Sequence, residues 1–124
     1  MNVVDCPDYK RALITGATGG IGKAIVKRFC GDGFSPIMIA RSAENLTQLT
    51  MELGSQYPHL DMIGDVCDIS ISSEVQALFK RLQERSIRIN VLVNGAGISG
   101  GGITYKVSDE LWVNVMNTNL NDYI

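Results

Sequence analysis

The chain lacks the features that mark membrane, secreted and nucleic-acid-binding proteins. None of its apolar runs approaches the ~20 residues that span a bilayer. Residues 1–12 contain no apolar segment of the kind found in signal peptides. The 11 Lys and Arg and 13 Asp and Glu give a net charge of −2, so no broad positive field would attract nucleic acid or an acidic membrane. We therefore expect a soluble, cytoplasmic protein.

Cysteine and histidine are scarce, and their spacing argues against a metal centre. The three cysteines, Cys6, Cys30 and Cys67, are an odd number and form no C-x-x-C pair. Zinc sites and disulfide frameworks usually show paired spacings, so we predict reduced thiols and no bound metal. The single histidine, His59, follows Pro58 in an expected turn and is interpreted as a surface residue.

The composition is that of one globular domain, with 45% hydrophobic residues in 124. Short apolar runs alternate with segments of helical periodicity. The runs that predict strands cover residues 12–15, 36–40, 60–64 and 89–93. The apolar stripes that predict helices lie within residues 21–29, 46–53, 75–82 and 112–116, the third helix starting near Ser70 or Ser72.

This alternation indicates an α/β fold. Strands that are apolar throughout are typical of a parallel sheet covered by helices on both faces. Right-handed crossovers then give a doubly wound, Rossmann-type sheet, for which we expect the strand order 3-2-1-4. We assign residues 1–124 to one such domain.

A glycine-rich segment, T-G-A-T-G-G-I-G, occupies residues 15–22 between the first predicted strand and helix. In a dinucleotide-binding turn one glycine permits the sharp turn, and another lets the backbone approach the pyrophosphate. Gly22 would allow close packing of helix on strand, and the helix N-terminus favours phosphate. A glycine-rich turn without a ligand is the alternative. The residues that we predict to contact the cofactor here are Gly16, Thr18, Gly19, Gly20 and Ile21.

Two other nucleotide sites fit this region poorly. A P-loop requires a glycine where this chain has Ala17, and a hydroxyl residue after Gly22-Lys23 where it has Ala24. A methyltransferase-like site would usually place an acidic residue at the end of the second strand to hold a ribose. That position is Arg41.

Arg41 predicts which dinucleotide is bound. An acidic residue in this zone bonds the ribose 2′-hydroxyl of NAD, whereas an arginine accommodates the 2′-phosphate of NADP. Ser42 could add a hydroxyl donor. The sequence thus favours NADP(H), the alternative being a solvated arginine at a strand end.

These residues resemble the short-chain dehydrogenase/reductase family. Its T-G-x-x-x-G-x-G motif matches residues 15–22. The resemblance implies an oxidoreductase that reduces a small-molecule carbonyl with NADPH and is a homo-oligomer at full length. It further implies that the adenine neighbours Asp65-Val66, that the N-N-A-G motif is Asn94-Gly95-Ala96-Gly97, and that Asn119 is a catalytic asparagine. Gly95 departs from the family pattern, which usually has a second asparagine there.

The segment after this motif is similar to that of the ketoreductases of aromatic polyketide synthesis. By that resemblance Ser99, Gly100 and Gly101 would face the substrate, a polyketide; a flexible loop is the alternative. The family's catalytic serine and its Y-x-x-x-K pair have no counterpart in the chain, since Tyr105 and Lys106 are adjacent. We therefore interpret the chain as the N-terminal part of a keto reductase, inactive by itself. The alternatives are a non-catalytic NADP(H)-binding module or sensor, and a chain completed by another chain.

Overall fold

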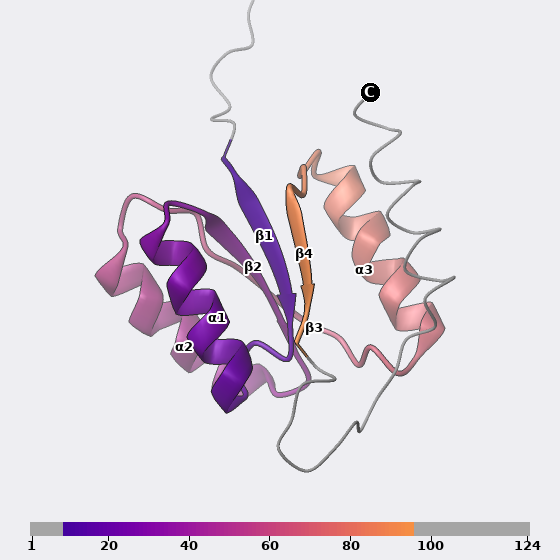
Figure 1. Cartoon of the computed structure of the whole chain (residues 1–124). Helices are drawn as coiled ribbons and strands as arrows, with labels where there is room; N and C mark the ends of the chain where they lie inside the picture. The colour runs from indigo at the N-terminus through magenta and orange to yellow at the C-terminus, as the bar shows by residue number, and fades with distance from the viewer. Residues whose placement is uncertain (1–8, 96–124) are drawn as a thin grey trace, which may run out of the picture.

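The computed structural model describes residues 9–95, which form a four-stranded parallel sheet with helices on both faces (Figure 1). Strands and helices alternate along the chain, as the sequence predicts. The elements are β1 (Arg11–Thr15), α1 (Gly20–Gly31), β2 (Ser35–Ala40), α2 (Ala43–Gln56), β3 (Ile63–Val66), α3 (Ser72–Glu84) and β4 (Val91–Asn94).

The strand order is β3-β2-β1-β4, which confirms the predicted order. All three strand pairings are parallel, and Thr15 at the end of β1 lies opposite Ile39 of β2 and Asn94 of β4. The carboxyl ends of the strands therefore meet at one edge of the sheet. Between β1 and β4 the strand order reverses, and in open α/β sheets ligands bind in the crevice at such a switch point.

The core has two layers, one on each face of the sheet. In Figure 1, α1 and α2 lie on one side and α3 on the other. Alternate residues of β1 face opposite layers: Leu13 packs in the cluster with Leu78 of α3, whereas Ile14 packs with Val26 of α1 and Leu53 of α2. All five are fully buried, and full burial of such a side chain stabilises the fold by about 1.5–3 kcal/mol.

Two strand positions differ from the sequence prediction. The third strand is Ile63–Val66 rather than 60–64, and the fourth is Val91–Asn94 rather than 89–93. Leu60 packs on the core from a turn in which its amide donates to the Tyr57 carbonyl, and Ile89 is 2% exposed in the loop before β4. An apolar run indicates which residues are buried, and in both segments the chain contacts the core before it pairs with the neighbouring strand. The predicted strands therefore begin too early. The predicted helix at 112–116 lies outside the described residues.

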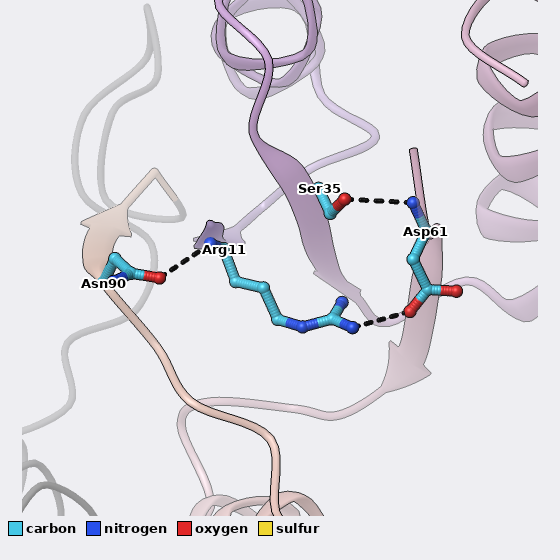
Figure 2. Close-up of polar contacts among 4 residues, drawn as sticks. All are labelled: Arg11, Ser35, Asp61 and Asn90. Atoms are coloured by element: carbon cyan, nitrogen blue, oxygen red, sulfur yellow. Dashed lines mark hydrogen bonds and ion pairs between the residues drawn. The ribbon is translucent and has the colours of Figure 1, made fainter. Parts of the chain in front are cut away.

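A buried arginine ties the strands together at the amino edge of the sheet (Figure 2). The Arg11 guanidinium donates to the Asp61 carboxylate at 2.7 Å, and the Arg11 amide donates to the Asn90 side chain at 2.8 Å. The Asp61 amide in turn donates to the Ser35 hydroxyl at 3.0 Å. This polar group links the start of β1 with β2 and with the segments that lead into β3 and β4. It lies opposite the edge where the strands end.

The described cysteines are buried thiols. Cys30 and Cys67 are free, and burial raises the pKa of each thiol to about 11. Both are therefore protonated and unreactive at neutral pH. None of the helices between residues 9 and 95 is long and apolar enough to cross a membrane, and this part of the chain contains no cluster of candidate metal ligands.

Candidate nucleotide-binding edge

The glycine-rich segment forms a tight turn at the carboxyl end of β1. Gly16 has φ +64°, in the left-handed region that side chains disfavour. The Gly19 amide donates to the Gly16 carbonyl at 3.2 Å, and the Ala17 amide donates to the Ile39 carbonyl of β2 at 3.1 Å. Gly16 is thus the glycine that permits the turn, and the turn is anchored on β2.

Gly22 brings α1 against this turn. A Cβ atom at Gly22 would lie 1.9 Å from the Gly16 carbonyl oxygen and 2.7 Å from its carbon. No side chain fits at that distance from a backbone atom. The structure therefore confirms that Gly22 provides the close packing of helix on strand.

Gly20 has a different role. Its φ is not positive, and a Cβ atom there would meet nothing within 4 Å. The turn itself consequently does not require glycine at this position, and open space lies in front of the start of α1. No side chain caps α1. Its first turn contains no acidic residue, whereas the first turns of α2 and α3 contain Glu44 and Glu74. The unscreened positive end of the helix dipole thus faces that space.

Arg41 and Ser42 lie at the same edge of the sheet, directly after β2. Arg41 is exposed, and Ser42 is the N-cap of α2, where its hydroxyl oxygen accepts from the Asn45 amide at 3.2 Å. The hydroxyl hydrogen remains able to donate in another direction. A guanidinium and a hydroxyl donor therefore follow β2, the strand on which the glycine turn is anchored.

Asp65 does not occupy the position predicted for it. It lies within β3, opposite Ile39, rather than after the strand. Its carboxylate accepts from Arg81 of α3, at 3.2 Å from Nε and 2.9 Å from Nη2, and raises the pKa of that guanidinium. The side chain is thus engaged with α3, on the face of the sheet. Val66 ends β3 and is 47% exposed.

Asp68 is the acidic residue that follows β3, and the sequence interpretation missed it. The Cys67 amide continues the strand pairing by donating to the Ala40 carbonyl at 3.0 Å, which places Asp68 at the carboxyl edge. The hydroxyl and amide of Ser70 donate to its carboxylate and lower its pKa, and the positive charge of Arg41 acts in the same direction. The available signal was a second acid–aliphatic pair, Asp68-Ile69, three positions after the first.

The end of β4 is joined to the end of β1. The Thr15 hydroxyl donates to the Asn94 side-chain oxygen at 2.9 Å, across the switch point. Gly95 is buried beside this pair. The other predicted residues, Ala96, Gly97, Ser99, Gly100, Gly101 and Asn119, lie outside the described residues.

Comparisons with known proteins identify the family of this chain. The model of the short chain dehydrogenase family matches residues 10–124. The chain belongs to the short-chain dehydrogenase family. Its membership agrees with the strand order and with the glycine turn between β1 and α1.

The chain is similar to several ketoreductases. It is 41% identical over 109 residues to a protein of Streptomyces violaceoruber assigned as ketoacyl reductase 1 of the granaticin polyketide synthase, covering 88% of this chain and 39% of that protein. A variant of the actinorhodin polyketide ketoreductase, solved with NADPH, is 37% identical with a TM-score of 0.66, covering 91% of this chain and 44% of that one.

The L-sorbose reductase of Gluconobacter frateurii, solved with NADPH and L-sorbose, is 26% identical with a TM-score of 0.68. That match covers 85% of this chain and 40% of the reductase. The chain therefore spans less than half the length of the proteins that it matches.

Proposed function

We propose that this chain is the nucleotide-binding part of an NADP(H)-dependent keto reductase. The observation that supports this most strongly is the pairing of two features at the carboxyl edge of the sheet. One is the glycine turn, which faces open space at an uncapped helix start. The other is the Arg41-Ser42 pair that follows β2.

We infer where each part of a dinucleotide would lie from the order of the strands. The pyrophosphate would lie at the start of α1, in the space before Gly20, where helix amides and dipole favour an anion. The adenosine would lie over β2 and β3, with Arg41 and Ser42 donating to its 2′-phosphate. The other half would then cross the switch point to the end of β4. When bound, NADPH supplies the hydride that reduces a carbonyl to an alcohol.

The acidic residue beside the adenine is better assigned to Asp68 than to Asp65. Asp65 is held by Arg81 within β3. Asp68 lies after the strand, near enough to Arg41 for that charge to lower its pKa. Its carboxylate, fixed by Ser70, is ionised at neutral pH and can accept from the adenine amino group while Arg41 binds the phosphate.

The substrate class is the carbonyl of a polyketide or a related cyclic ketone. Support comes from the similarity to the granaticin and actinorhodin proteins, whose names refer to polyketide synthesis. We keep Ser99, Gly100 and Gly101 as the proposed substrate-facing residues and Asn119 as the proposed catalytic asparagine. The residues that would complete the catalytic set have no match in this sequence.

The proposal is tested with the full-length natural protein and its Arg41→Asp variant. The unmutated protein should oxidise NADPH in the presence of a bicyclic ketone and should prefer NADPH to NADH. A charge-assisted hydrogen bond contributes roughly 1.5–3 kcal/mol, or about 10- to 100-fold in affinity, and Arg41→Asp should reverse the preference.

Arg85→Asp is the matched control for this charge reversal. Arg85 is exposed and caps the C-terminus of α3, at the amino edge of the sheet. This variant should keep the preference for NADPH. Unchanged cofactor selectivity in Arg41→Asp, or an equal loss in Arg85→Asp, would contradict the assignment of Arg41 to the 2′-phosphate.

A further inference from the structure

The acidic side chain that follows β3 is fixed by the turn in which it lies. This turn covers residues 68–71 and leads from β3 to α3 (Figure 1). The Ile71 amide donates to the Asp68 carbonyl at 3.0 Å and closes the turn. The amide and the hydroxyl of Ser70 donate to Asp68 Oδ1 at 3.0 and 2.6 Å. Both bonds go to the same carboxylate oxygen, so none of the described residues donates to Oδ2, which is left to accept from a ligand.

Glu74 of α3 holds the start of this turn. The Cys67 amide donates to the Ala40 carbonyl, and the next amide, that of Asp68, donates to Glu74 Oε1 at 2.9 Å. Glu74 lies in the first turn of α3, whose N-cap is Ile71. A glutamate at the third helical position usually accepts from the amide of the N-cap residue. Here it accepts from a residue three positions earlier, so its side chain spans the whole turn.

The same bonds fix Asp68 relative to the end of β2. The residue before it, Cys67, is bonded to Ala40, and Arg41 follows Ala40 directly. The positive charge of Arg41 acts on the Asp68 carboxylate. The open carboxylate oxygen and the guanidinium assigned to the 2′-phosphate therefore hold a fixed relative position, and the Glu74 carboxylate is the contact from α3 that maintains it.

We propose that Glu74 is a positioning residue that makes the nucleotide site selective for adenine. It acts through the Asp68 backbone, which it holds so that Oδ2 faces the 6-amino group of the base. A purine with a 6-oxo group, such as hypoxanthine, would place an acceptor against the carboxylate and leave Oδ2 without a donor. This inference rests on the proposed binding of NADP(H).

The test compares two dinucleotides in the full-length protein. NADP⁺ carries adenine, and nicotinamide hypoxanthine dinucleotide phosphate carries a 6-oxo group in place of the 6-amino group. The unmutated protein should bind NADP⁺ more tightly by about tenfold or more, because a site built to accept from the amino group rejects an analogue that lacks it. Glu74→Ala should lower this ratio by about fivefold or more, chiefly through weaker binding of NADP⁺.

Two control variants separate the hydrogen bond from the charge. In Glu74→Gln the amide oxygen still accepts from the Asp68 amide, so the ratio should stay within about twofold of its original value. Glu84→Ala removes the same charge from the other end of α3, where Glu84 is exposed, and should also keep the ratio.

A further variant covers the case in which Glu74→Ala does not fold. Glu74→Asp keeps the negative charge that stabilises the start of α3, but its side chain is one methylene shorter and cannot reach the Asp68 amide. It should lower the ratio as Glu74→Ala does.

An unchanged ratio in Glu74→Ala or Glu74→Asp would overturn the positioning role, as would a ratio that falls equally in Glu74→Gln or Glu84→Ala. Equal affinities of the unmutated protein for the two dinucleotides would also overturn it, while leaving the binding of NADP(H) intact. Failure of the unmutated protein to bind NADP⁺ would contradict the proposed function itself, and the inference with it.

Discussion

Gly22→Ala and Gly20→Ala add the same methyl group to the same turn of α1, and we expect opposite results. At Gly22 the new Cβ would lie 1.9 Å from the Gly16 carbonyl oxygen, so to reach 3.0 Å the helix must move by at least 1.1 Å. The obstacle is backbone on both sides. Overpacking of a well-packed site costs about 1–3 kcal/mol, and we expect the upper end of this range in the free energy of unfolding.

At Gly20 the methyl group meets open space, and the φ is compatible with any residue. Alanine forms helix more readily than glycine by up to ~1 kcal/mol, so the stability of Gly20→Ala should be equal to or above that of the unmutated protein. Its cofactor affinity should nevertheless fall, because the methyl group enters the space that we assign to the pyrophosphate.

Urea denaturation of the full-length proteins measures the difference in stability, and an unchanged m-value checks that unfolding is two-state. Titration with NADPH measures the cofactor affinity. A Gly22→Ala protein as stable as the unmutated one would refute the close packing of α1 on the turn. NADPH binding by Gly20→Ala at the original affinity would show that the phosphates do not lie at the start of α1.

Two further predictions concern charged groups. Asp61→Ala removes the partner of the Arg11 guanidinium, whose side chain is 10% exposed, and should lower the free energy of unfolding in urea by about 1–3 kcal/mol. Asp61→Asn should recover part of this loss, and equal stability of the unmutated protein and both variants would contradict a structural role for the pair. The pKa of the Asp68 carboxyl, measured by NMR, should lie below that of an ordinary aspartate, and Ser70→Ala should raise it; an unchanged pKa in this variant would contradict the role of Ser70. Because the pKa is lower in the folded state, the stabilisation that it contributes is present above the unfolded pKa and is lost as the pH falls through the folded pKa.

The sequence predicts the architecture well because its signals are local and repeated. Each apolar run that ends in a turn residue indicates one strand. Because an amphipathic helix lies between each pair of strands, the strands are expected to form a parallel sheet. The glycine turn is predictable for the same reason, since Gly16 and Gly22 serve contacts a few residues apart in the chain. Arg41 is found by counting to the end of the second strand, which is correctly placed within one residue.

The misplacement of Asp65 has a physical origin in the edge of the sheet. β3 is a short edge strand in which Gly64 and Val66 are exposed, so its apolar pattern is weak, and the partly buried Leu60 of the adjoining turn packs on the core instead. The predicted strand therefore ended too early, and Asp65 was assigned to the loop. The hydrogen bond between Thr15 and Asn94 was also beyond prediction, because it joins residues that are distant in sequence.

The central claim is that the carboxyl edge of this sheet binds a 2′-phosphorylated dinucleotide, and an equilibrium titration of the full-length protein with NADP⁺ and NAD⁺ tests it most directly. The account predicts that NADP⁺ binds about 10- to 100-fold more tightly, the contribution expected of the Arg41 guanidinium at the phosphate. Equal affinities, or tighter binding of NAD⁺, would contradict it.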